Sequence, residues 1–468
     1  RANTTASSNI GIGYQSLCSN QTGGCNVAVG NSALLKNTTQ RNTAVGFSAA
    51  ICNTTGQQNV AIGYYALDDN TTGGCNIAIG TAMGLNSTGG DNIGIGNGAL
   101  GNNTTCSNNV AVGHSAAQET GSGHGIVAIG AFALCKNTSG DNNTAVGFCT
   151  LECNTSGASN VALGVQALAA NTTASCNTAV GQNALQDNTT GATNTAVGSY
   201  SLSTAITAGN NAAVGHCALN LTTTSENAAF GANALRAQTT GIYNTAVGSA
   251  AGLKTTTGTR NVAVGTTALA CNTTGSCNTA VGGMDGGTLP TMWCNTSGCR
   301  NTALGNATLV KNTTGDFNTA VGATALYANT TADNNTALGV GALNTNTTGA
   351  SNTAVGLNSL VLNTTASNNT AVGFESLQAN TTGNANVAMG RGALELNTTA
   401  TNNAAFGRSA GRQITTGGGQ TLVGTNAGCN ITTGTNNQVF GDIAGTDAVR
   451  NLTTSCSNNI VIGNNSNT

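Results

Sequence analysis

The chain repeats one short pattern of polar, small and branched apolar positions along its whole length. In the copy at 318–322 the residues read N-T-A-V-G, an Ala-Leu step follows at 325–326, and N-T-T follows at 329–331. The central glycine occurs 27 times between Gly13 and Gly463, and 21 of the 26 intervals are 17 residues long. A fixed short period of this kind indicates a repeat architecture rather than a set of globular domains.

The residues before each central glycine, which we call phase 0, alternate in size. Phase −1 is Val, Ile, Leu, Phe or Met in every copy, and phase −2 is Ala or Gly in all but the last three copies. Alternation with period two predicts a β-strand. We expect phases −3 and −1, which carry the larger side chains, to face a core. The Ala/Gly side must then meet a close neighbour, either the opposite wall of the same coil or another chain.

Polar residues also keep fixed phases. Phase −4 is Asn in 25 of 27 copies, the exceptions being Ile126 and Gln420. Such a column predicts a ladder in which each side-chain amide donates to the same amide one turn away, although a plain turn residue would also suit this position. Ala at phase +3 and Leu at +4 predict a short second strand. The N-T-T-G segment that begins with Asn at +7 predicts an exposed loop.

No single repeat can bury its apolar residues alone, so the turns must stack. We therefore predict an all-β protein, a parallel β-solenoid (β-roll or β-helix) of about 27 turns with a 17-residue repeat. It should form one continuous solenoid over residues 1–468, with long-turn insertions at 283–300 and 446–458. The first insertion holds Pro290 and Trp293, the only Pro and Trp of the chain. It is either a binding face or simply a tolerated insertion.

The strand pattern resembles a known family. The copies at 59–63 (N-V-A-I-G) and 76–80 (N-I-A-I-G) are similar to the head repeats of trimeric autotransporter adhesins and to related repeats of phage and viral tail fibres. The resemblance extends over the whole chain. It implies a left-handed parallel β-roll, an assembly of three chains, and attachment to a surface.

Composition narrows the function. Charged residues make up 6% of the chain, and the net charge is −2, which gives no attractive field for nucleic acid or an anionic membrane. No apolar run is long enough for a membrane span. The acidic residues share no phase as a catalytic pair, and motifs for nucleophilic catalysis or phosphate binding are missing. The histidines and cysteines do not form a zinc motif. We predict no enzyme activity, no cofactor and no metal.

The 16 cysteines and the many N-x-S/T triplets indicate an oxidising, extracellular location. If phases +5 or +6 and +12 meet at the base of the loop, cysteines at these phases lie within disulfide reach. The predicted pairs are Cys18–Cys25, Cys52–Cys75, Cys153–Cys176, Cys271–Cys277 and Cys294–Cys299. No partner is predicted for Cys106, Cys135, Cys149 or Cys217.

The Asn at phase +7 begins an N-x-S/T triplet in many copies, which predicts N-glycosylation along one edge of the solenoid. The same residues are also good turn formers without any sugar. The predicted attachment sites are Asn37, Asn53, Asn70, Asn137, Asn154, Asn171, Asn312, Asn329, Asn346, Asn363, Asn380 and Asn397.

The two ends of the chain are in phase with the repeat. We expect a mature or excised piece that begins at Arg1 and stacks end to end through the turns around Asn3 and 460–463. The sequence thus predicts a structural subunit of a glycosylated extracellular filament, on a cell or a virion, with itself as partner. The first alternative is a trimeric adhesin or tail-fibre rod that binds a surface glycan or receptor. A further alternative is an ice-binding solenoid with ranked Thr hydroxyls.

Overall fold

The computed structural model describes residues 6–284, 287, 289–441 and 454–462. Contacts divide the chain into two compact units, residues 1–228 and 229–468. Most of the predicted insertion at 446–458 falls outside the described residues, and so do Asn3 and Gly463, which belong to the predicted stacking ends.

The described residues form 27 strands of three residues each and no helix. The N-terminal unit contains β1 Ile10–Ile12, β2 Val27–Val29, β3 Thr43–Val45, β4 Val60–Ile62, β5 Ile77–Ile79, β6 Ile93–Ile95, β7 Val110–Val112, β8 Val127–Ile129, β9 Thr144–Val146, β10 Val161–Leu163, β11 Thr178–Val180, β12 Thr195–Val197 and β13 Ala212–Val214. Strand β14, Ala228–Phe230, lies where the two units divide. The C-terminal unit contains β15 Thr245–Val247, β16 Val262–Val264, β17 Thr279–Val281, β18 Thr302–Leu304, β19 Thr319–Val321, β20 Thr336–Leu338, β21 Thr353–Val355, β22 Thr370–Val372, β23 Val387–Met389, β24 Ala404–Phe406, β25 Thr421–Val423, β26 Gln438–Phe440 and β27 Ile460–Ile462.

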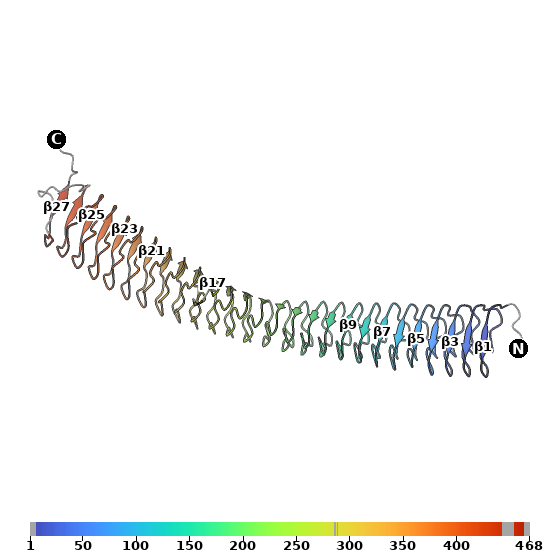
Figure 1. The fold of residues 1–468 in the computed structure, drawn as a ribbon. Helices are drawn as coiled ribbons and strands as arrows, with labels where there is room; N and C mark the ends of the chain where they lie inside the picture. The colour runs from blue at the N-terminus through green and yellow to red at the C-terminus, as the bar shows by residue number, and fades with distance from the viewer. Residues whose placement is uncertain (1–5, 285–286, 288, 442–453, 463–468) are drawn as a thin grey trace. The chain divides into compact units, whose positions relative to one another are not determined.

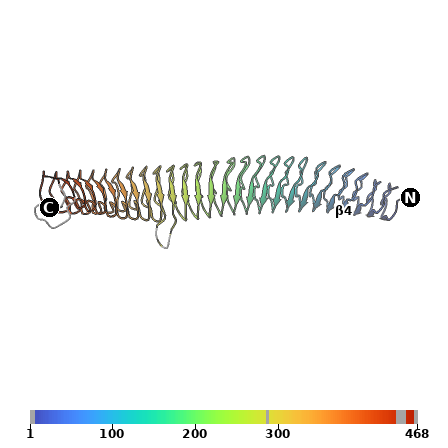
Figure 2. The ribbon, with the colours of Figure 1, turned by 90° about the horizontal axis from the view of Figure 1, so that it is seen from above.

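Within each unit, every strand pairs in parallel with the strand of the next turn. The register is set by the repeat, so that Ala320 of β19 lies opposite Ala337 of β20. The same pairing runs through β1–β13 in one unit and β15–β27 in the other, for example β1 with β2 and β26 with β27. Figure 1 shows successive strand arrows side by side, and Figure 2 shows them following one another in sequence order. The predicted all-β parallel solenoid with a 17-residue repeat is confirmed.

The prediction of which strand face is inside was wrong. The middle residue of the strand, at phase −2, is buried in β2 through β26, whereas the residues at −3 and −1 are half-buried or exposed. Ala337 has no exposed surface, while the neighbouring Leu338 is 48% exposed. The small residues therefore pack against the opposite wall of the same coil, and the branched aliphatics point away from it.

The small residues face inward, and not the large ones, because the interior of the coil is narrow. Leu at phase +4, such as Leu343, is fully buried and fills the space opposite the strand. A Cβ added at Gly94, a phase −2 residue, would already lie 3.3 Å from two atoms of Met83, which takes the core position of Leu at phase +3 in a turn that is one residue shorter. Only a residue of about the size of Ala fits there.

A size exchange near the C-terminus supports this packing. Leu422 occupies phase −2, and the facing +4 positions are Gly411 and Gly428. A Cβ at either glycine would come within 2.6–2.8 Å of the Leu422 side chain. The large residue has moved from one wall to the other, so the interior volume is conserved.

The segment after the glycine is a turn and not the predicted second strand, so each repeat has one strand. Residues at phases +2 and +4 adopt left-handed backbone conformations, as in Thr324 (φ 57°) and Leu326 (φ 49°). Such angles are unfavourable for residues with a side chain. They persist because the turns bond to each other: the Leu326 N–H donates to the Ala342 carbonyl of the next turn at 3.0 Å.

The central glycine is required by a close approach of the backbone. Gly339 has φ of 142°, and a Cβ there would lie 2.4 Å from the carbonyl oxygen of Gly356 in the next turn. No residue with a side chain fits between two backbones at this separation. The recurrence of this glycine in every turn follows from the stacking itself.

The Asn column at phase −4 is a buried ladder, as predicted, but its main bond differs from the prediction. The Oδ1 of Asn318 accepts from the backbone N–H of Asn335 at 3.0 Å, and the Asn335 Nδ2 donates to the Gly349 carbonyl. In several turns the amide also donates to the previous amide, as from Asn318 to Asn301 at 3.2 Å. Each Asn therefore links one turn to the next at the start of the strand.

Candidate functional site

The Asn column at phase +7, predicted to be glycosylated, lies in the interior. The twelve predicted attachment sites, Asn37, Asn53, Asn70, Asn137, Asn154, Asn171, Asn312, Asn329, Asn346, Asn363, Asn380 and Asn397, have no exposed surface. Asn329 Nδ2 donates to Asn312 Oδ1 at 2.9 Å, and Asn346 Nδ2 donates to Asn329 Oδ1 at 3.0 Å. The predicted exposure of this column was wrong. A glycan on Nδ2 does not fit this arrangement, since it would break the amide ladder and occupy the core.

The structure joins none of the five predicted cysteine pairs by a disulfide: Cys18–Cys25, Cys52–Cys75, Cys153–Cys176, Cys271–Cys277 and Cys294–Cys299. The two columns do not meet as expected, because the backbone at each cysteine is bonded to a different part of a neighbouring turn. The Cys52 N–H donates to the Asp68 carbonyl, whereas the Cys75 N–H donates to the Gln57 carbonyl and its thiol faces Gln58.

The structure brings together a different set of thiols. Cys271 lies at phase +6, and Cys294, which follows the insertion, takes the equivalent position in the next turn, since each directly precedes the buried Asn of its turn. The Cys271 N–H donates to the Trp293 carbonyl. Burial, followed by the neighbouring Cys271, raises the pKa of the Cys294 thiol. The N-T-T-G and N-T-S-G segments that follow the two cysteines could have shown this equivalence, but the long interval after Gly282 gives the cysteines different phases when they are counted from the glycine.

The insertion at 283–300 is largely part of the solenoid. Pro290, Thr291 and Met292 are buried, and Met292 occupies the core position that Leu holds in other turns. Trp293 is half-buried. The described residues from 290 onward thus complete an ordinary turn and do not form a separate binding loop.

The outer face of the strands is an exposed apolar surface. We define it as the residues at phases −3 and −1 of each strand. Large apolar side chains at −1 are exposed by about 40% in many turns, including Ile62 (39%), Val247 (40%) and Met389 (42%). The face carries no charged residue. Contiguous apolar surface of this extent is typical of an interaction site.

Threonines line the solenoid in three columns that differ in what their hydroxyls do. At phase +8 the hydroxyl is used internally, as when Thr330 donates to the Thr347 carbonyl at 3.1 Å. At phase +9 the side chain is exposed, as in Thr331. On the outer face, phase −3 is Thr in β17–β22 and is exposed in β18–β20. Two of the three columns can therefore contact something outside the chain.

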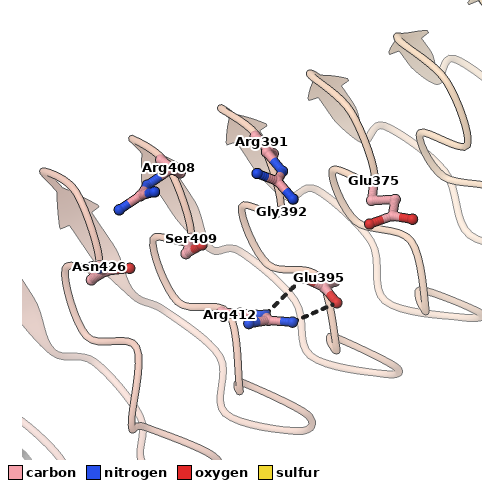
Figure 3. A pocket seen from close by; sticks show the side chains of 8 residues that line it. All are labelled: Glu375, Arg391, Gly392, Glu395, Arg408, Ser409, Arg412 and Asn426. Atoms are coloured by element: carbon pink, nitrogen blue, oxygen red, sulfur yellow. Dashed lines mark hydrogen bonds and ion pairs between the residues drawn. The ribbon is translucent and has the colours of Figure 1, made fainter.

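One pocket gathers charge in a chain that has little. The lining residues are Glu375, Arg391, Gly392, Glu395, Arg408, Ser409, Arg412 and Asn426, around a volume of about 310 Å³. Arg391 and Arg408 leave successive turns at phase +1, as Figure 3 shows, and Glu375 lies beside Arg391. On the other side of the pocket, Arg412 forms an ion pair with Glu395 at 2.8 and 3.2 Å. This ion pair raises the pKa of Arg412 above the usual value of an arginine.

Across the described ranges, no three His, Cys, Asp or Glu side chains are grouped so that they could hold a metal ion. The same residues include no helix that is long and apolar enough to cross a membrane. No family model matches the sequence, and no curated protein matches it.

Proposed function

We propose that this protein is a structural subunit of an extracellular fibre, on a cell or a virion, whose chains associate side by side through the outer face. The observation that carries the proposal is the large apolar residue at phase −1, which is present in every repeat and points away from the core. A stable single chain gains nothing from exposing such a column. An interaction surface that runs along the solenoid explains it.

A second copy of the chain fits this face better than an unrelated partner. Its face would repeat at the same spacing of about 4.8 Å, so that the side chains of one copy can pack into the gaps of the other. The face has no charge, so two copies do not repel each other, and a charged partner finds nothing to bind.

The available area is sufficient. One three-residue strand covers about 10 Å by 4.8 Å, or roughly 50 Å² per turn. Specific interfaces bury about 600–1,000 Å² per partner. The 13 strands of one unit, β1–β13 or β15–β27, supply roughly 650 Å² per partner, which lies within this range. Lateral association also agrees with the three-chain assembly implied by the resemblance, whereas end-to-end stacking rests on terminal turns that are only partly described.

The test compares two triple variants in analytical ultracentrifugation over a concentration series. Val321, Leu338 and Val355 are changed to Asp on the outer face. The control changes three other residues of the same turns to Asp, the exposed phase +9 residues Thr331, Thr348 and Thr365. We expect the wild type and the control to associate and the outer-face variant to remain monomeric with an unchanged circular dichroism spectrum. A monomeric wild type, or an outer-face variant that still associates, would contradict the proposal.

Ice binding is a second candidate, because the structure supplies the exposed strand threonines that it needs. Thr302, Thr319 and Thr336 point outward from adjacent strands beside a column of apolar residues. Thermal hysteresis of the folded chain would support ice binding. Its absence, together with self-association, would favour the fibre.

A further inference from the structure

The charged pocket is lined by residues at phases +1, +2 and +5, which follow the strand, and the proposed fibre does not explain it. Its five ionisable residues are three arginines and two glutamates, so the local charge is +1 in a chain of net charge −2. Because Arg412 is already paired with Glu395, the free positive charge belongs to Arg391 and Arg408.

Arg391 and Arg408 lie at the same phase of successive turns, so the stacking of the turns sets the distance between their backbones. The backbones of adjacent turns are about 4.8 Å apart, so an anion that lies between the two side chains can attract both guanidinium groups, which point in different directions in Figure 3. Arg391 lies over the Phe374 ring at 5.6 Å, which orients it. The Arg408 side chain makes no hydrogen bond or ion pair with any described residue. Planar guanidinium groups suit carboxylates in particular.

The rest of the pocket indicates what else the ligand carries. Glu375 stands beside the arginines, and an ionised carboxylate can only accept hydrogen bonds. It disfavours an anion with two charges and requires donor groups on the ligand. Ser409 and Asn426 add a hydroxyl and an amide, and the pocket has room for a single small molecule.

The space depends on one glycine. The +2 residue is Glu375, Ser409 or Asn426 in the neighbouring turns but is Gly392 at the centre of the pocket. A Cβ at Gly392 would lie 2.9 Å from Glu395 Oε2. A side chain at this position would therefore fill the pocket.

We propose that this pocket binds an acidic sugar, whose carboxylate lies between Arg391 and Arg408 and whose hydroxyls donate to Glu375. A uronic acid and a sialic acid share this chemistry. The site would give the chain an affinity for acidic glycans that does not depend on how the chains assemble.

Calorimetric titration of the full chain tests this, with glucuronate and N-acetylneuraminate as two separate ligands and glucose as the neutral counterpart of glucuronate. We expect at least one acid to bind, glucose not to bind, and added salt to weaken binding. The acid that binds shows whether the pocket takes a uronic acid or a sialic acid. If neither acid binds, or if glucose binds equally well, the proposal is overturned. The same holds if sulfate displaces the sugar at equal concentration, since the pocket would then recognise only the anion.

Variants connect the binding to the pocket. Arg408→Gln should weaken binding by about tenfold or more, because it removes a charge-assisted hydrogen bond. Gly392→Asn should abolish binding, because the new side chain would fill the pocket. The backbone tolerates this change, since Asn426 has the same phase and the same left-handed conformation. Arg300→Gln is the matched control, as Arg300 also lies over an aromatic ring, that of Phe317, outside the pocket. Equal affinity in Arg408→Gln and Arg300→Gln would refute the site.

Discussion

Replacing Asn329 by Ala tests whether the buried amide ladder holds the turns together. Asn329 accepts from Asn346 and donates to Asn312 and to the Ala332 carbonyl. The Ala332 carbonyl keeps a second donor, Asn318 Nδ2 at 2.8 Å. The variant therefore leaves two buried groups without a partner, the Asn312 oxygen and one N–H of Asn346. At about 1–3 kcal/mol for each group, the expected loss is about 2–6 kcal/mol.

The appropriate measurement is amide hydrogen exchange, which gives the free energy of local opening turn by turn. A single unfolding free energy is less informative for a repeat protein, whose turns can open separately. We expect faster exchange in β19 to β21 and little change several turns away. Thr331→Ala, at an exposed position two residues along, is the control and should stay within about 0.5 kcal/mol of the wild type.

Asn329→Asp adds a pH dependence with a defined sign. The buried carboxylate would face the Asn312 oxygen, so its folded pKa should rise above the usual value of about 3.9. A raised pKa means that stability is highest below the unfolded pKa and is lost as the pH rises through the folded one. If Asn329→Ala opens no more easily than Thr331→Ala, or if Asn329→Asp gains stability as the pH rises, the ladder is not what holds these turns.

Three further predictions concern the core, the backbone and one thiol. Leu343→Ala should lower the local stability by about 2–5 kcal/mol, whereas Leu338→Ala in the same turn should cost less than about 1 kcal/mol, because Leu343 is fully buried and Leu338 is not. Gly339→Ala should destabilise its turn by at least about 2 kcal/mol, seen as faster hydrogen exchange, since its φ of 142° excludes other residues. Burial and a nearby carboxylate raise the pKa of the Cys149 thiol from 9.0 to about 11, so its alkylation rate should still increase between pH 9 and 11.

Each of these has a control. Gly84→Ala should be mild, because a Cβ at Gly84 meets only an Asp68 oxygen at 3.5 Å. Glu152→Gln should lower the pKa of Cys149, and an unchanged alkylation profile would contradict the assigned cause. The stability that the protonated Cys149 thiol supports is full below pH 9 and is lost as the pH rises through about 11. Equal effects of Leu343→Ala and Leu338→Ala would show that the interior has been assigned to the wrong face.

The repeat period in the sequence was sufficient to predict the architecture. A glycine every 17 residues, a period-two block before it and an Asn before that predict parallel strands stacked in register, and the structure has this arrangement. The reason is that each turn rests only on copies of itself, so one unit determines the contacts of the next. The Asn ladder at phase −4 could be predicted for the same reason.

Which face of the strand is inside was decided only by the tertiary structure. Alternation shows which residues share a face, but the usual rule that large residues are buried failed because Leu at phase +4 already fills the narrow interior opposite Ala. The N-T-T-G segment has the composition of an exposed turn. The amide of its Asn is nevertheless buried, because it forms a hydrogen bond with the identical amide of the adjacent turn. The pocket of Arg391 and Arg408 joins residues 17 positions apart, and only the stacking of turns places their side chains on one surface.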